Sequence, residues 1–282
     1  MLCYLLGIVL GVVASPGTAR AQALPTPILS YTFDGATPWA NSGSATATLS
    51  SVGGATIGAG SPSGTGGSLQ VSATGSAYAT ATGVTGLSGL TSFTLSAWIN
   101  VSSLGSNSKI FSTLGSGDGI DFYLNGSPSA LSLALEVNST SGGQTSTATV
   151  NASGSWLFVA VTYTSTAANS GTVTFYTGTS ASSVALLGTI RTIQTGGGGG
   201  AVLDTNGGTS STVDIGATPQ VAGRSPTASI DEVQLYNGVL TPTQLDAVRQ
   251  LDAVPEPSVP ALLLPAGLGL VGLAWRRRIL SA

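Results

Sequence analysis

Asp231 is the residue whose place in its strand most calls for a chemical explanation. The stretch from Ile230 to Tyr236 alternates in polarity, and Asp231 falls in phase with Val233 and Leu235. Because successive side chains of a strand point to opposite faces, this phase predicts that Asp231 points toward the core. A buried carboxylate needs a partner, which a metal ion, another cation or backbone N–H groups would supply. The alternative is an acid on a frayed, hydrated strand end.

Two pairs of carboxylates are close enough in sequence to be considered for acid–base catalysis. Glycoside hydrolysis uses two carboxyl groups about 5–9 Å apart. Asp231 and Glu232 are adjacent in a predicted strand, so their side chains point to opposite faces. Asp118 and Asp121 lie on a Gly-rich loop that enters a strand, which favours a turn or a weak cation site. We therefore predict no catalytic residues and no enzyme activity, with a glycoside hydrolase or lyase as the alternative.

Polar and aromatic side chains can also form a ligand-binding surface. Binding sites combine aromatic rings with a few convergent polar groups. The residues of these kinds on the polar side of their predicted strands are Trp98, Asp121, Tyr123, Asn125, Glu136 and Tyr176. We predict that they bind ligand. For the aromatic residues, the alternative is packing under loops or against a second sheet.

The composition excludes several classes of function. The chain has no His, and its only cysteine is Cys3 near the N-terminus. Ser-His-Asp catalysis and His-ligated zinc hydrolysis are therefore excluded, as is a disulfide within the chain. Only 7% of the residues are charged, and 11 Asp and Glu outnumber 8 Lys and Arg. This acidic balance argues against a nucleic-acid partner.

The elements that carry these residues read as short strands separated by turns. The segment from Phe93 to Val101 gives the clearest alternation of apolar and polar residues. The segment from Trp156 to Tyr163 is apolar on both faces, which predicts a central strand covered on both sides. The Gly/Ser/Thr/Ala-rich stretch from Ala40 to Gly67 is either a long loop or a set of edge strands. About a dozen short strands and few helices predict an all-β sandwich or jelly roll.

One short helix is predicted after the strand that contains Asp231. Thr241 fits the N-cap, Pro242 the first helical position, and Gln244 completes a capping box. The apolar residues that then face one way are Leu245, Val248 and Leu251.

Four local sequences occur in the order found in LamG-like, or concanavalin A-like, jelly-roll domains. They are Y-T-F-D-G at 31–35, F-T-L-S-A-W-I at 93–99, W-L-F-V-A-V-T-Y at 156–163 and I-D-E-V-Q-L-Y at 230–236. The chain resembles this family from Leu29 to Leu251. The resemblance implies a two-sheet jelly-roll sandwich with a short C-terminal helix over residues 22–252. The fold hosts lectins, hydrolases, lyases, adhesins and spacers, so the resemblance leaves two function classes open. We predict an exported, non-catalytic surface or matrix protein with a carbohydrate-binding or adhesive role, and the alternative is a carbohydrate-active enzyme.

The resemblance further implies a metal site. In sugar-acting relatives a structural calcium often lies where the first and last strands meet. Asp231 matches the closing-strand acid, and Asp34 and Gly35 match the opening position. Calcium takes several oxygen ligands, including backbone carbonyls, which a Gly-rich corner supplies. The expected cofactor is therefore a structural Ca²⁺ at Asp231, Asp34 and Gly35.

The N-terminal end reads as an export signal. An apolar run from Leu2 to Ala14 precedes an A-x-A pattern at Ala19 and Ala21. This order predicts a signal peptide over residues 1–21. A retained membrane helix is the alternative.

The C-terminal end reads as a sorting signal. An apolar segment over 258–275 follows Pro255, Glu256 and Pro257, and precedes Arg276, Arg277 and Arg278. Its length predicts a transmembrane helix, and the arginines would hold its end in the cytoplasm. Residues 253–282 resemble a bacterial PEP-CTERM signal. That resemblance implies an exosortase partner, transient anchoring in the inner membrane, and delivery to the cell surface or extracellular matrix. A plain C-terminal anchor is the alternative.

Overall fold

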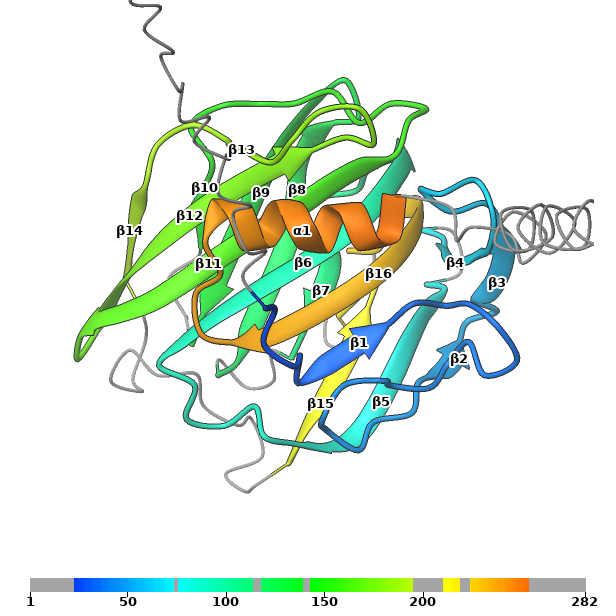
Figure 1. Ribbon diagram of the computed structural model, residues 1–282, viewed down its shortest axis with the longest axis horizontal. Coiled ribbons are helices and arrows are strands. Elements are labelled where there is room, and N and C mark those ends of the chain that lie inside the picture. Colours follow the sequence, from blue (N-terminus) through cyan, green and yellow to red (C-terminus); the bar gives the residue numbers. More distant parts are fainter. Residues whose placement is uncertain are drawn as a thin grey trace, which may run out of the picture.

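The computed structural model describes residues 23–73, 76–113, 118–138, 143–194, 210–218 and 224–253, which build two β-sheets packed face to face (Figure 1). Within these residues, one sheet has nine strands, ordered β13-β12-β11-β6-β16-β4-β3 with β1 also paired to β16 and β14 to β12. Its strands are β1 (Leu29–Tyr31), β3 (Thr56–Ala59), β4 (Gly67–Val71), β6 (Ser92–Ser103), β11 (Leu157–Ala167), β12 (Ser170–Gly178), β13 (Ala185–Leu186), β14 (Arg191–Gln194) and β16 (Thr227–Asn237).

The second sheet has seven strands among the described residues, ordered β10-β9-β8-β7-β15-β5-β2. They are β2 (Ser50–Val52), β5 (Tyr78–Thr85), β7 (Ser108–Ser112), β8 (Ile120–Ser127), β9 (Ala130–Val137), β10 (Gln144–Thr145) and β15 (Ser210–Ile215). Every pairing within both sheets is antiparallel. The predicted all-β, two-sheet sandwich is confirmed.

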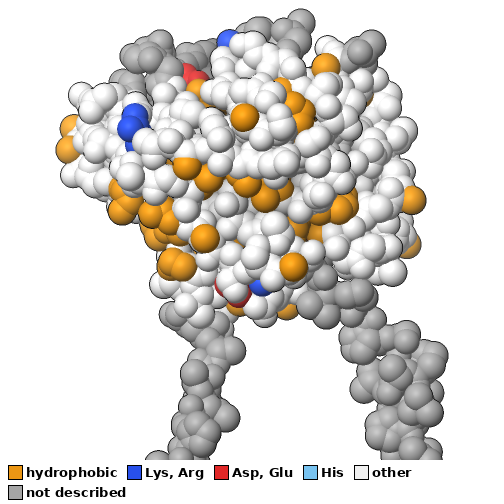
Figure 2. All heavy atoms as spheres, turned by 90° about the horizontal axis from the view of Figure 1, so that it is seen from above, with side chains coloured by type: hydrophobic (Ala, Val, Ile, Leu, Met, Phe, Trp, Pro, Cys, Tyr) orange, Lys and Arg blue, Asp and Glu red, His pale blue; other side chains and the backbone are white. Residues whose placement is uncertain are grey.

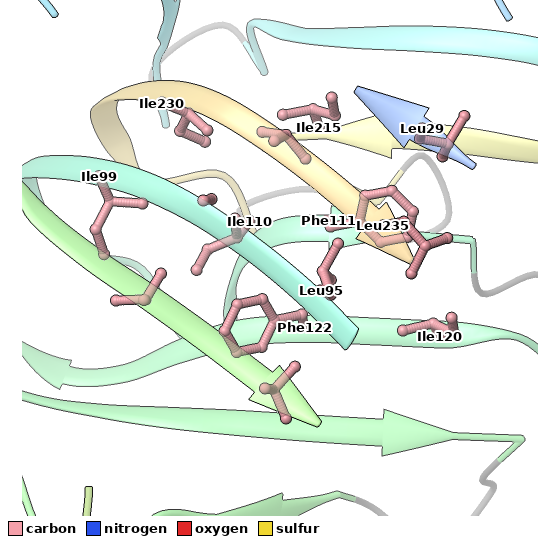
Figure 3. Close-up of a cluster of buried hydrophobic side chains, with 14 of the residues drawn as sticks. Leu29, Leu95, Ile99, Ile110, Phe111, Ile120, Phe122, Ile215, Ile230 and Leu235 are labelled. Carbon is pink, nitrogen blue, oxygen red and sulfur yellow. The ribbon is translucent and has the colours of Figure 1, made fainter. Parts of the chain in front are cut away.

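The main hydrophobic core lies between the two sheets. Leu95 and Ile99 of β6 reach it from one side, and Phe122 of β8 reaches it from the other (Figure 3). All three side chains are fully buried. Since alternate residues of each strand enter this core, the residues between them must lie on the outer faces of the sandwich.

The helix α1 (Pro242–Ala253) covers the outer face of the nine-stranded sheet (Figure 1). A second buried cluster under this helix consists of Trp98, Phe158, Ala160, Tyr236, Leu240, Leu245 and Val248. Strand β11 therefore packs against apolar groups on both of its faces, which confirms the prediction from its two-sided apolar sequence. Burial of the helix against the sheet, rather than helix propensity alone, holds α1 in place.

The predicted capping box is present at the start of α1. The Gln244 backbone N–H donates to Oγ1 of Thr241 at 3.2 Å, and the Thr241 N–H donates to Oε1 of Gln244 at 2.9 Å. Leu251 differs from the prediction, because 68% of it is exposed to solvent. Val248 is the last apolar residue of α1 that packs on the sheet, and Leu251 lies beyond it.

The stretch from Ala40 to Gly67 contains both of the features that its sequence left open. It forms a loop, then the edge strands β2 and β3. Asn41 organises the loop, because its Oδ1 accepts the N–H of Ser30 at 2.7 Å and its Nδ2 donates to the carbonyl of Ala45 at 2.6 Å. One side chain thus takes the place of the missing strand pairing.

The predicted signal peptide, the A-x-A cleavage site and all of the predicted C-terminal sorting signal after Ala253 lie outside the described residues. Within the described part of the chain, α1 included, the structure contains no helix that is both long and apolar enough to cross a membrane.

Candidate functional site

A row of polar side chains crosses the outer face of the seven-stranded sheet. Asp214 of β15 lies opposite Ser112 of β7, and Ser112 lies opposite Asp121 of β8. Asp121 in turn lies opposite Glu136 of β9, and Thr80 of β5 extends the row beyond Asp214. Residues opposite one another on paired strands share a face of the sheet. Hydrogen-bonded strand pairing thus brings together groups that lie far apart in the sequence.

A buried ion pair lies in the middle of this polar row. The Nζ atom of Lys109 donates to Oδ2 of Asp121, and the two side chains are 1% and 0% exposed. The Nζ atom also lies 4.2 Å from the centroid of the Tyr123 ring, which is within the range of a cation–π contact. Tyr123 is opposite Lys109 in the β7–β8 register. Lys109 is the only lysine of the chain, and it has no access to solvent.

Burial dominates the electrostatics of the row. It lowers the pKa of the Lys109 ammonium, which the Arg224 charge lowers further, although the Asp121 charge opposes this. Burial raises the pKa of Asp121 and, together with the Asp121 charge, that of Glu136. It also raises the pKa of Asp214 to about 6. Burial thus shifts the pKa of each acid upward and that of the one amine downward, toward the neutral forms.

The predicted ligand-binding residues of this sheet lie at different depths. Asp121 is fully buried, and Tyr123 is only 6% exposed. Asn125 and Glu136 are half-buried, so their polar groups reach the surface. Asp121 and Tyr123 therefore form the floor beneath a face whose accessible groups include Asn125 and Glu136.

Sequence reasoning missed two residues on this face. Tyr78 of β5 is half-buried, and the Asp214 charge contributes to raising its pKa, so the two lie near each other. Arg224 is half-buried, and its carbonyl accepts the N–H of Lys109 at 2.8 Å. The small alternating residues Ala77 and Ala79 were a usable signal, because both enter the core and so turn Tyr78 outward.

The structure separates two predicted ligand-binding residues from the others. Trp98 of β6 and Tyr176 of β12 lie on the outer face of the nine-stranded sheet, the opposite side of the sandwich from Glu136. Trp98 is fully buried beneath α1 and meets Phe158 edge to face, with ring centroids 5.6 Å apart. Tyr176 packs at the border of the same cluster. The prediction of a ligand contact at Trp98 is wrong, because the helix covers the ring.

The predicted orientation of Asp231 is also wrong. Asp231 lies opposite Trp98, on the outer face of the nine-stranded sheet, whereas the preceding Ile230 enters the core. The register of β16 against β6 shifts after Asp231, and Glu232 has a positive φ of 49°. Such a β-bulge inserts one extra residue and changes the phase of the alternation. Val233 therefore faces the core even though Asp231 does not.

The bulge lies between the two strands that pair with the other edge of β16. Strand β4 pairs with residues 228–230 of β16, and β1 pairs with residues 233–235. At this junction Oδ1 of Asp231 accepts the N–H of Glu232 at 2.9 Å, whereas Oδ2 is buried without a hydrogen-bond partner. Asp34 follows β1, and its Oδ1 accepts the N–H of Gly67 at 2.6 Å.

The junction offers carboxylate oxygens that partly fit a metal ion. Burial is the main cause that raises the pKa of Asp231 to about 9, and the charges of Glu232 and Asp34 add to it. An unpartnered buried oxygen near a second carboxylate is what a cation would compensate. Gly35 is exposed and offers only backbone oxygen. The described residues contain no group of three or more His, Cys, Asp or Glu that could hold a metal, so carbonyls or water would have to complete the site.

Residues 73–246 match the family model described as the concanavalin A-like lectin/glucanases superfamily. The chain belongs to this superfamily. The match covers β5 to the first half of α1, and so contains both the polar row and the bulge at Asp231. No protein in the search of curated sequences matches the chain.

Several solved structures resemble the chain at low sequence identity. One is domain 4 of AbnA, a GH43 extracellular arabinanase from Geobacillus stearothermophilus, in complex with arabinotriose. It is 17% identical with a TM-score of 0.52, over 79% of this chain and 98% of that one. Another is the botulinum neurotoxin type G receptor binding domain, 14% identical with a TM-score of 0.52, over 80% of this chain and 51% of that one. The chain thus spans about half the length of that neurotoxin domain, and these likenesses establish the fold alone.

Proposed function

We propose that the chain is a non-catalytic, carbohydrate-binding or adhesive module that binds a glycan on the outer face of the seven-stranded sheet. The observation that carries this proposal is the polar row, in which half-exposed Glu136 lies above a floor of buried charged groups. In support, the arabinanase domain of the same fold was solved with arabinotriose, and a botulinum neurotoxin DC binding domain was solved with SialylT.

The accessible side chains on this face suit a glycan. The Glu136 carboxylate and the Asn125 amide accept and donate hydrogen bonds to hydroxyl groups. Tyr78, at the other side of the sheet, offers a half-exposed ring on which a sugar could stack. Figure 2 looks at the molecule from above the view of Figure 1, and charged side chains are few and far apart on that side, in keeping with the 7% of charged residues in the chain. A neutral or weakly charged glycan therefore fits the chain better than a polyanion.

The assignment as non-catalytic rests on burial. Asp121 and Glu136 form a facing pair of carboxylates, which their separation in sequence had hidden. Paired strands hold the Cβ atoms of such side chains about 5 Å apart, which lets their carboxyl groups approach the separation of about 5–9 Å that glycoside hydrolysis uses. Asp121, however, is fully buried and bonded to Lys109. A substrate on the surface would not reach it, which supports binding without turnover.

The ends of the chain complete the proposal. We propose export through residues 1–21, then sorting by an exosortase through residues 253–282, with transient anchoring in the inner membrane. The product would reach the cell surface or extracellular matrix. We also propose a structural Ca²⁺ near Asp231 and Asp34, supported by the unpartnered buried oxygen of Asp231.

A glycan array followed by calorimetry tests the proposed binding. Asn125→Ala should weaken binding of the best glycan about fivefold, the effect of one hydrogen bond worth about 1 kcal/mol. Glu136→Ala should weaken it at least as much. Thr174→Ala, half-buried on the nine-stranded sheet, is the matched control and should bind normally. Failure to bind any glycan would contradict the proposal. Turnover of laminarin, xylan, agar or alginate that Glu136→Gln abolishes would favour the enzyme alternative.

A further inference from the structure

We propose that Lys109 and Asp121 become joined by an intramolecular amide bond after folding, with Glu136 transferring the proton. The bond would link Nζ of Lys109 to Cγ of Asp121, and so cross-link β7 to β8 through their side chains. The modification shares Glu136 with the proposed glycan site. Its detection needs no ligand, so either proposal can fail without the other.

The geometry brings the two reacting groups into contact. Nζ of Lys109 hydrogen-bonds Oδ2 of Asp121, and the backbone pairing of β7 with β8 fixes the strands that carry them. The Tyr123 ring lies 4.2 Å from Nζ and limits the movement of the amine. Holding two groups in reactive geometry corresponds to an effective concentration of about 10⁵–10⁸ M for the best-oriented intramolecular reactions. A slow condensation therefore becomes accessible on the lifetime of a folded protein.

The environment favours the reactive protonation states. An ammonium ion and a carboxylate do not condense, whereas a neutral amine can attack a neutral carboxylic acid. Burial lowers the pKa of the Lys109 ammonium and raises that of the Asp121 carboxyl group. Both shifts favour transfer of the proton from nitrogen to oxygen within the pair. The exclusion of water also protects the product from hydrolysis.

Glu136 is positioned to carry the proton. It lies opposite Asp121 on the neighbouring strand β9, and its charge interacts with Lys109. Unlike the two reacting residues, Glu136 is half-exposed. Glu136 can therefore exchange a proton with Lys109 and Asp121. The water molecule that the reaction releases can leave past the exposed part of Glu136.

The reaction balances without any other reactant. The nitrogen lone pair of Lys109 attacks Cγ of the protonated Asp121, which forms an N–Cγ bond and a tetrahedral intermediate. The Glu136 carboxylate takes a proton from the nitrogen and delivers it to a hydroxyl group on Cγ. The Cγ–O bond then breaks and one water molecule leaves. Neither group is oxidised or reduced, and Glu136 ends in its starting form.

The bond also explains why a lone lysine is found at this position. Lysine is almost never fully buried unless it is paired. A buried ion pair adds little net stability, because desolvation of both ions offsets their attraction. An amide has no charge to desolvate, so formation of the bond would remove that cost from the interior of the sheet.

Proteolysis of the denatured full-length protein tests the proposal. A protease specific for lysine can cleave only after Lys109, because the chain has one lysine. The amide should block this cut. Chymotrypsin cleaves after Phe111 and Phe122, which places the two residues in different peptides. Mass spectrometry should then find a branched peptide that is one water lighter than the sum of its two parts. Complete cleavage after Lys109, or a lysine blocked by any other group, overturns the proposal.

Two variants separate the roles of the residues. Asp121→Ala should restore complete cleavage after Lys109 in the denatured chain, whether or not the variant folds. Glu136→Gln keeps the size of the side chain but cannot take up the proton, so a folded protein with a cleavable lysine is expected. If Glu136→Gln is cross-linked as completely as the wild type, Glu136 does not transfer the proton. Ser132→Ala, on β9 four residues before Glu136, is the control and should remain cross-linked.

Discussion

Asp231 lies directly opposite Trp98 on the outer face of the nine-stranded sheet, and one of its carboxylate oxygens is buried without a hydrogen-bond donor. The β-bulge at Glu232 causes this arrangement, because it breaks the alternation that would otherwise turn Asp231 into the core. The residue is therefore held between an aromatic cluster and the end of β1, where either a proton or a cation must neutralise it.

Without calcium, Asp231 should make the protein less stable as pH rises. Its pKa is raised from 3.8 to about 9 in the folded state. Between these values the folded state holds a proton that the unfolded state has released, so the free energy of unfolding falls as pH increases. Asp231→Asn cannot ionise and should lack this fall. Thermal melts of both proteins in chelator, from pH 5 to pH 9, measure the difference.

Calcium should stabilise the wild type through the same residue. A ligand that binds only the folded state at a hundredfold excess over its Kd adds about 3 kcal/mol. For a domain of this size the melting temperature should rise on the order of 5–10 °C. Asp231→Asn should not respond to calcium. If chelation shifts both proteins equally, or shifts neither, Asp231 is not a calcium ligand.

Asp214 and Asp246 should respond to pH in opposite directions. Burial raises the pKa of Asp214 to about 6, so its contribution to stability falls as pH rises from about 4 to about 6. The hydrogen bond from Arg249 lowers the pKa of Asp246, whose contribution is therefore lost as pH falls through its folded-state value. At pH 7, Asp214→Asn should raise the free energy of unfolding relative to the wild type, and Asp246→Asn should lower it. Urea titrations at pH 7 and pH 4 distinguish the two, and equal effects at both pH values contradict the assignment.

Removing a buried side chain from α1 should be costly, and removing an exposed one should not. Leu245 is fully buried against the sheet, so Leu245→Ala should cost about 2–5 kcal/mol. Leu251 is 68% exposed, and Leu251→Ala should change stability by no more than about 0.5 kcal/mol. Chemical denaturation provides the comparison. Equal losses in both variants would mean that α1 does not pack as described.

Loss of the capping box should destabilise the helix start. Thr241→Ala removes the hydroxyl that accepts the Gln244 N–H, at a cost of about 1 kcal/mol. The melting temperature should fall by about 2–4 °C. Thr243→Ala, an exposed position in the first turn of the same helix, is the control and should have a much smaller effect. A larger loss in Thr243→Ala would contradict the cap.

Much of the fold could be predicted because its signals are local. Alternating polarity identified β6, the two-sided apolar segment identified β11, and Thr241 with Gln244 identified the start of α1. Each signal depends on sterics and hydrogen bonding among neighbouring residues, which a sequence states directly. The order of four such motifs also identified the family correctly.

The candidate site depended on contacts between residues far apart in the chain. The Asp121–Glu136 and Asp214–Ser112 pairs are set by strand register, which no single segment specifies. Trp98 had the correct phase for an outer face, but only the packing of α1 decided that this face is covered. One residue in a left-handed conformation, Glu232, reversed the predicted direction of Asp231. The sequence by itself determined which residues alternate and where elements begin, whereas tertiary pairing and coverage decided which side chains meet and which reach solvent.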